Sequence, residues 1–320
     1  MSKAGVDWFK FRTQSAPLTV FEAIRPAFAG GEDLELEPEM PGKDGWKSRR
    51  SLRLYGDVVA WMDYGGDSQR GWLRFEMPGK GCGWVCDWSA VAALVGRLQR
   101  AELMRVDLKV DTIDGSVSHE KVLEAYKEGR FKREGGGRNP VLKTVETSRV
   151  VDGRTAYVGA RTSSRFIRCY EKGWQILSKM ALPEFLMKPN LRVDFDDGLG
   201  QRNVRDFYRV EVELKAVDGV VLPWPCLVER DAYFAGSAPF CASLVDSAPR
   251  RIYSLPSDFD KKANLFSAVL NCKQSYGGAL NALLQLYGDS MEAKAKIFDM
   301  VVGDNVSKRL KEEGVLWLDL

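Results

Sequence analysis

The chain is poor in histidine and in paired cysteines, and it has no long apolar run. His119 is the only histidine among 320 residues, which excludes metal sites built on a histidine pair and argues against a Ser-His-Asp triad. Six cysteines are scattered, and Cys82 and Cys86 lack the second pair that a zinc site needs. No stretch approaches the roughly 18 apolar residues of a membrane span, and the start lacks the apolar run of a signal peptide. We therefore expect a reduced, cytoplasmic protein without a membrane segment.

Charge is distributed unevenly along the chain. The formal net charge is only +3, which is too small to indicate nucleic acid by itself. Between Lys127 and Lys172, however, twelve Lys or Arg stand against five Asp or Glu, so this block alone exceeds the whole-chain total. A basic field of this kind favours a nucleic-acid partner, and the alternative is a solvated basic loop. The residues of this block that we assign to DNA are Lys132, Arg133, Arg161 and Arg165.

Two stretches, 105–111 and 209–215, alternate strictly between apolar and charged residues. Such alternation predicts half-buried strands with one face on a core. The other face then carries Arg105, Asp107, Lys109, Asp111, Arg209, Glu211, Glu213 and Lys215. One interpretation is a solvated outer face with cross-strand ion pairs. The second is a functional face.

A third stretch, 154–175, favours the functional interpretation. It predicts two short strands around a polar turn, and the second strand ends in Arg168, Tyr170 and Lys172 at a spacing of two. Side chains two apart on a strand share a face, so the phenol would stand between a guanidinium and an ammonium. These cations could lower its pKa from about 10 and bind a phosphate, so Tyr170 is a candidate nucleophile.

Three carboxylates on the other two strands could hold a metal ion near that phenol. We predict Asp107, Asp111 and Glu211 as ligands, and oxygen ligands favour Mg²⁺ or Mn²⁺ over zinc. Such an ion could polarise a phosphodiester while the phenol attacks it. Glu213 shares this face, and whether it binds the metal or pairs with Lys215 or Lys109 stays open.

The order of predicted elements indicates an α+β fold. We expect a mainly antiparallel sheet with a charged catalytic face and helices on the other face, followed by a C-terminal helical part. Prolines punctuate the chain after Lys215, so we place a soft boundary there. The predicted domains are 1–217 for nicking and DNA binding and 218–320 for the helical part, which could be continuous with the first.

Several motifs along the chain occur together: DWFKFR near the start, the GKGC turn, RVDLKVD, YVGARTSSRFIRCYEKG, YRVEVELK and KQSYGGALNALL. This set resembles the replication initiation factor family (Rep_trans), whose members are rolling-circle initiators of small plasmids and filamentous phages. The resemblance covers roughly residues 5 to 290, and its most specific part surrounds Tyr170.

The resemblance implies a site-specific nickase that cuts one strand of a double-strand origin. Tyr170 would keep the 5′ phosphate, leaving a 3′ hydroxyl for extension, and carboxylates would hold the divalent metal. Arg168, Lys172 and Arg209 would bind phosphate or stabilise charge. Implied partners are origin DNA, a host helicase and a host polymerase. Plasmid members form homodimers, but the C-terminal part here looks closer to phage members, which leaves the oligomeric state open.

Three alternatives use the same residues differently. A non-cleaving DNA-binding regulator of the same fold would need neither Tyr170 nor the carboxylates. A tyrosine recombinase would use an Arg-His-Arg set on a helical domain, unlike a strand tyrosine in a chain with one histidine. A hydrolytic nuclease would keep cutting without Tyr170. Whether a second tyrosine such as Tyr157 closes the DNA circle is open as well.

Overall fold

The structure is a computed structural model that describes residues 3–132, 138–146, 153–179, 192–194, 201–217, 219–252, 276–288 and 290–301. The chain divides into two compact units, Met1–Tyr253 and Ser254–Leu320. The second contains, within its described part, a helix over residues 276–287 and the helix α9 (Met291–Val301). None of the described helices is both long enough and apolar enough to cross a membrane.

The first unit is built on β-strands. Its strands are β1 (Gly5–Thr13), β2 (Glu35–Leu36), β3 (Met40–Pro41), β4 (Ser48–Leu54), β5 (Asp57–Tyr64), β6 (Leu73–Pro78), β7 (Glu102–Thr112), β8 (Leu142–Val145), β9 (Thr155–Val158), β10 (Arg165–Glu171), β11 (Arg192–Asp194), β12 (Gln201–Asn203) and β13 (Tyr208–Lys215). Its α-helices are α1 (Pro17–Ile24), α2 (Gly79–Cys82), α3 (Trp88–Val95), α4 (His119–Lys127), α5 (Lys172–Lys179), α6 (Arg230–Ala235) and α7 (Pro239–Ala242). Short 3₁₀ segments are Arg25–Ala27, Gly31–Asp33, Asp67–Gln69, Val204–Asp206 and Trp224–Leu227.

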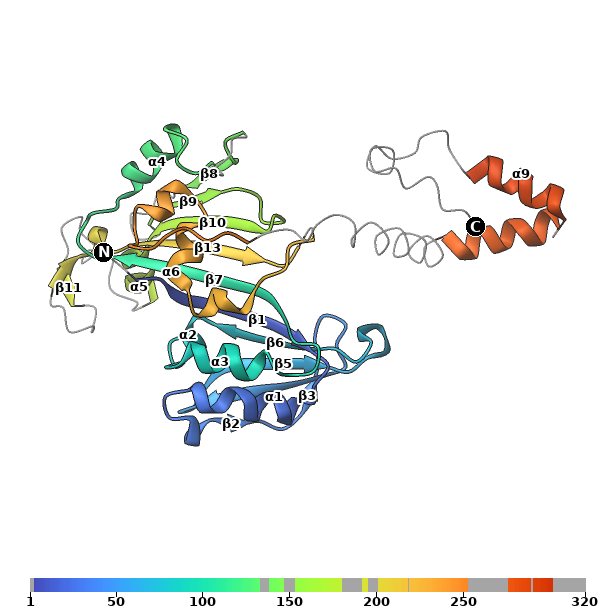
Figure 1. The fold of residues 1–320 in the computed structure, drawn as a ribbon, viewed down its shortest axis with the longest axis horizontal. Coiled ribbons are helices and arrows are strands. Elements are labelled where there is room, and N and C mark those ends of the chain that lie inside the picture. Colours follow the sequence, from blue (N-terminus) through green and yellow to red (C-terminus); the bar gives the residue numbers. More distant parts are fainter. Residues whose placement is uncertain are drawn as a thin grey trace. The chain divides into compact units, whose positions relative to one another are not determined.

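One large antiparallel sheet organises this unit (Figure 1). In the described part of the chain its order is β2-β4-β5-β6-β1-β7-β13-β10-β9-β8, with β3 paired to β4, and β11 and β12 form a separate hairpin. The three strands with charged alternation are neighbours, because β13 lies between β7 and β10. Mixed helix and strand with a large antiparallel sheet was the predicted fold class, and that part of the prediction is confirmed.

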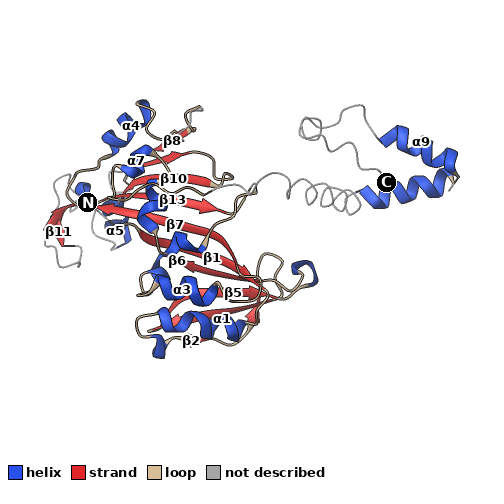
Figure 2. Ribbon diagram, viewed as in Figure 1, coloured by secondary structure: helices blue, strands red, loops and turns tan. Residues whose placement is uncertain are grey.

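The two faces of the sheet carry different residues. Apolar residues such as Val106, Leu108, Val210 and Val212 are buried in one continuous core, and helices α1, α3 and α6, labelled in Figure 1, lie over this face (Figures 1 and 2). Helix α3 begins at Asp87, whose carboxylate accepts hydrogen bonds from the backbone N–H groups of Ser89 and Ala90, both at 2.9 Å, as an N-cap residue does. The opposite face carries most of the charged residues of β7, β10 and β13, among them Asp107, Arg168, Arg209 and Glu211; we call it the charged face.

Two boundaries differ from the sequence prediction. Strand β10 ends at Glu171, so Lys172 begins α5 instead of extending the strand. The division between units follows Tyr253, whereas we predicted a boundary after residue 217. The reason is burial: the segment after 218 contributes Leu222, Leu227 and Phe234 to the core of the first unit.

Candidate active site

Tyr170 lies on the charged face of β10, opposite Arg209 of β13. Its side chain is buried, with 7% of the residue exposed. The phenol donates a long hydrogen bond of 3.4 Å to Oε2 of Glu211. The register that puts Arg168 opposite Glu211 and Tyr170 opposite Arg209 therefore surrounds the phenol with charged groups from two strands.

Two cations lie over the Tyr170 ring. The guanidinium carbon of Arg168 is 4.9 Å from the ring centroid and Nζ of Lys172 is 5.7 Å from it. Lys172 reaches the ring from the first turn of α5, where Nζ also donates to Oε1 of Gln175 at 2.7 Å. The phenol thus stands near both predicted cations, although Lys172 is not on the strand.

The predicted lowering of the Tyr170 pKa is wrong in this structure. Burial raises the pKa well above its ordinary value; Arg209 and Arg168 lower it, and Glu211 and Asp7 raise it further. The expectation failed because it counted the nearby cations and not the loss of hydration, which disfavours a buried phenolate. In this state the phenol is neutral at physiological pH, so a nucleophilic role requires a proton acceptor.

Each of the three predicted carboxylate ligands pairs with an arginine. Asp107 accepts two hydrogen bonds from Arg105 at 2.7 and 2.6 Å. Asp111 accepts two from Arg209 at 2.6 and 2.7 Å. Both oxygens of Glu211 lie 2.6 Å from Nη2 of Arg168. This pairing neutralises the face locally. The Asp111–Arg209 pair links β7 to β13 and the Glu211–Arg168 pair links β13 to β10, whereas Arg105 and Asp107 both belong to β7.

The three carboxylates do not gather at one point. Asp107 and Asp111 are four residues apart on an extended strand, which separates their Cα atoms by about 13 Å, farther than two short side chains can span through one ion. Within the described residues, no three His, Cys, Asp or Glu side chains lie close enough to bind a metal together. Glu211 is diagonal to both aspartates, at about 7–8 Å across a sheet, so it can share an ion with one of them.

Asp7 is a member of this site that the sequence analysis missed. Its Oδ1 lies 3.0 Å from Nη1 of Arg209 and 3.0 Å from Nζ of Lys109. Burial raises the Asp7 pKa, but Arg209 and Lys109 outweigh it, and the pKa is lower than usual. Simple alternation would put Asp7 with Phe9 in the core. A β-bulge between Val6 and Trp8 turns it to the charged face instead, and the sequence signal was an acid where the alternation of Phe9 and Phe11 calls for an apolar residue.

Asp107 and Glu213 form an acidic pair that lies farther from Tyr170 than Glu211 does. They are opposite each other in the register, and Arg105 Nη2 contacts both, at 2.6 and 2.8 Å. Burial raises the pKa of Asp107 to about 7, against the lowering effect of Arg105. Glu213 also contacts Nζ of Lys215 at 2.6 Å, which is one of the two pairings left open from the sequence.

The four predicted DNA-binding residues that the structure describes do not form one patch. Arg209 is buried beneath the site, whereas Arg161 is exposed and its guanidinium lies 5.5 Å from the Tyr157 ring centroid. Lys132 is exposed in the turn after α4, and Arg133 lies outside the described residues. Arg165 points to the helix-covered face, where it donates to the backbone oxygens of Ser237 and Phe131.

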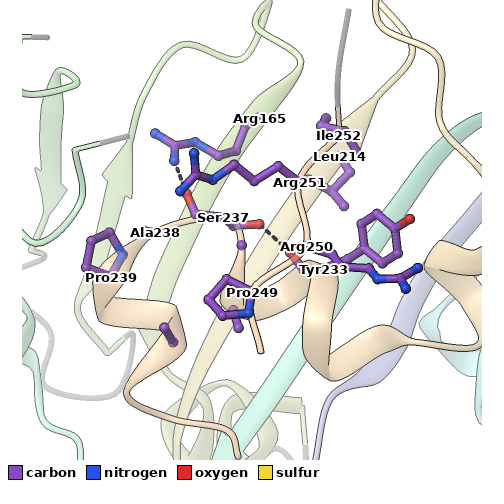
Figure 3. Close-up of a pocket in the computed structure, with 13 residues that line it drawn as sticks. Arg165, Leu214, Tyr233, Ser237, Ala238, Pro239, Pro249, Arg250, Arg251 and Ile252 are labelled. Atoms are coloured by element: carbon purple, nitrogen blue, oxygen red, sulfur yellow. Dashed lines mark hydrogen bonds between the residues drawn. The ribbon is translucent and has the colours of Figure 1, made fainter. Parts of the chain in front are cut away.

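A cavity of about 430 Å³ lies beside Arg165 on that helix-covered side. It is lined by residues of β10, β13 and the segment from Tyr233 to Ile252, including Arg250 and Arg251 (Figure 3). Arg165 is odd-numbered on β10, whereas Tyr170 is even-numbered, so the two side chains leave the sheet on opposite faces. The cavity is therefore separate from the Tyr170 site.

Comparison with known proteins places the chain in a family. The model of the replication initiation factor family matches residues 101–263, just over half of the chain, and this segment contains β7, β10 and β13. A search of curated proteins gave no match. Among solved structures, the chain is similar to a rolling circle replication initiator protein from Geobacillus stearothermophilus, with 19% identity, a TM-score of 0.48 and coverage of 74% of this chain and 84% of that chain. From the match of the family model, this chain belongs to the replication initiation factor family, Rep_trans.

Proposed function

We propose that the protein initiates rolling-circle replication by nicking one strand of an origin with Tyr170. The observation that carries this proposal is the placement of Tyr170 beside Glu211, with Arg168 and Lys172 over its ring, inside the segment that matches the family model. The product would be a 5′-phosphotyrosine link and a free 3′ hydroxyl, from which a host polymerase extends.

The residues at the site divide the work of this transfer. The Tyr170 oxygen forms a bond to phosphorus while the bond from phosphorus to the 3′ oxygen breaks. Glu211, 3.4 Å away, accepts the phenolic proton, and the departing 3′ oxygen takes a proton from water. Arg168 and Lys172 stabilise the negative charge that develops on the phosphate oxygens. Glu211 must act as base because burial keeps the phenol protonated.

A divalent ion, Mg²⁺ or Mn²⁺, is part of the same proposal. When bound, it would polarise a non-bridging phosphate oxygen. Magnesium commonly takes only one or two carboxylates and completes its shell with water and substrate phosphate. Asp111 and Glu211 are the pair that fits. Asp111 is aligned with Tyr170 across the sheet, with Arg209 between them, and Glu211 accepts the hydrogen bond of Tyr170, whereas Asp107 lies farther along β7. A carboxylate has two oxygens with about four lone-pair positions. Glu211 could therefore bind the ion through one position while Oε2, which faces the phenol, accepts the phenolic proton.

The proposal is tested by cleavage of supercoiled or single-stranded origin DNA in Mn²⁺ or Mg²⁺. We expect wild-type protein to form a covalent DNA adduct on a denaturing gel, Tyr170→Phe to form none, and Tyr157→Phe to behave as wild type. Cutting that survives in Tyr170→Phe without an adduct would indicate a hydrolytic nuclease. Specific binding to a verified origin without nicking by wild type would indicate a non-cleaving regulator.

A further inference from the structure

The charged face continues beyond the Tyr170 site onto the strands that precede the segment matched by the family model. The register aligns Trp8, Asp107, Glu213 and Phe166 in one row across β1, β7, β13 and β10. Directly opposed residues share a face, so Trp8 lies on the same face as Tyr170. Three inter-strand steps separate Trp8 from Phe166, or about 14 Å.

A second tryptophan adjoins Trp8 on this face. Trp61 of β5 is aligned with Glu76, Lys10 and Arg105 in the next row. The two indole rings meet edge to face with centroids 6.3 Å apart. The guanidinium of Arg105 lies 5.1 Å from the Trp8 ring centroid, and that of Arg49 lies 5.6 Å from the Trp61 centroid. We call Trp8, Trp61, Arg49 and Arg105 the tryptophan platform.

The platform differs from the tryptophans on the helix-covered side. Its two indoles are partly exposed and have guanidinium groups beside them, whereas Trp88 is buried against Phe9 and the partly buried Trp224 packs on Phe11 of the apolar layer. At the end of the same sheet, Arg74 lies 5.4 Å from the Trp46 centroid and Arg12 lies 4.3 Å from the Trp72 centroid. The open face thus repeats one unit, a partly exposed indole with a guanidinium over it.

We propose that the tryptophan platform binds unpaired bases of single-stranded DNA as the strand leaves the Tyr170 site. Partly exposed aromatic rings stack on bases of any sequence, and stacking carries the binding because Arg105 and Arg49 are already paired with Asp107 and Asp63. A duplex hides its base faces, so the platform favours an unpaired strand. Continuity of the sheet supports this occupant, because the platform and Tyr170 lie on one face of the same sheet, with β7 and β13 between the strand of Trp8 and that of Tyr170. The inference rests on the proposed nicking function, which requires a locally unpaired origin.

The test measures binding of a labelled oligothymidylate to the full chain by fluorescence anisotropy, in the Tyr170→Phe background so that cleavage does not interfere. We expect Trp61→Leu to raise Kd about 5- to 150-fold, the effect of one lost stacked base, and Trp61→Phe to restore most of the affinity. The matched control is Trp84→Leu, which alters an exposed tryptophan packed on Tyr55. Trp8→Leu should act like Trp61→Leu, and thermal melting confirms that each variant folds.

An equal Kd of Trp61→Leu and Trp84→Leu for the oligothymidylate would overturn the proposal that the platform binds DNA. A change of oligomeric state in Trp61→Leu with unchanged DNA affinity would also overturn it, in favour of a second copy of the chain on this face. The nicking assay separates this result from the proposed function. Nicking with no dependence of binding on Trp61 removes only the platform, whereas Trp61-dependent binding without nicking removes only the catalytic proposal.

Discussion

We expect the ion pairs of Arg209 to contribute most to stability among the charged groups beneath Tyr170. It extends from β13, donates twice to Asp111 of β7 and contacts Asp7 of β1 at 3.0 Å. Its side chain is only 7% exposed, whereas those of Asp7 and Asp111 are 18% and 29% exposed. Replacement by methionine keeps a side chain of similar bulk and leaves Asp111 without its arginine, while Asp7 keeps its contact with Lys109.

The magnitude follows from this burial. Removing one partner of a fully buried ion pair costs about 3–5 kcal/mol, and an exposed pair contributes about 0–1 kcal/mol. Because water reaches both carboxylates partly, we expect Arg209→Met to lower the free energy of unfolding by about 2–3 kcal/mol. For a unit of this size, each kcal/mol shifts Tm by about 2–4 °C, so Tm should fall by about 4–12 °C.

Tryptophan fluorescence is the suitable assay for this change. All tryptophans except Trp317 belong to the first unit, so the melting curve reports that unit. The control is Arg250→Met, which removes a 2.8 Å pair with Glu229 whose side chains are 56% and 40% exposed and should shift Tm much less. If Arg209→Met melts no earlier than Arg250→Met, Arg209 does not tie the three strands and the proposed organisation of the site is wrong.

Three further predictions concern pH and metal. Burial raises the pKa of Asp107 in the folded state to about 7, above the unfolded value of about 3.9, so the free energy of unfolding falls as pH rises from about 4 to 7. We expect Asp107→Asn to flatten this fall when Tm is measured at pH 5, 6, 7 and 8. An unchanged slope of Tm against pH would contradict the raised pKa of Asp107. With Glu211 as proton acceptor, the rate of adduct formation should be nearly independent of pH between 7 and 9. In Glu211→Gln the rate should rise about tenfold per pH unit, because the fraction of Tyr170 present as phenolate rises in that proportion below its pKa. A rate that is independent of pH in Glu211→Gln would exclude Glu211 as the proton acceptor. Asp111→Asn should raise the Mn²⁺ concentration for half-maximal cleavage by about tenfold or more, and Asp107→Asn should change it little. A larger effect of Asp107→Asn than of Asp111→Asn would show that Asp107, and not Asp111, binds the ion.

The strands of the site could be predicted from the sequence because each one carries its own signal. Alternation in 105–111 and 209–215 predicts that the apolar residues are buried, and the structure confirms this for Val106 and Val210. It did not predict that Asp107, Arg209 and Glu211 on the other face are buried as well. The spacing of Arg168 and Tyr170 likewise predicts a shared face, which the register bears out. These features depend only on the period of two in an extended chain.

Features that depend on long-range packing could not be predicted. A bulge turned Asp7 toward Arg209, and nothing in the local alternation specifies a bulge. The pKa of Tyr170 depends on burial by neighbouring strands, which outweighs the nearby cations. The pairing of each predicted metal ligand with an arginine follows from the register between β7, β13 and β10, which requires knowing that these strands are neighbours.

The most direct test of the central claim is to identify the residue that carries DNA after cleavage. The adduct would be digested with nuclease and trypsin and sequenced by mass spectrometry. The tryptic peptide Cys169–Lys172 contains Tyr170, whereas Tyr157 falls in Thr155–Arg161. We predict a nucleotide phosphate on Tyr170 in the first peptide. A phosphate on Tyr157, or on any residue other than Tyr170, would contradict the proposed active site.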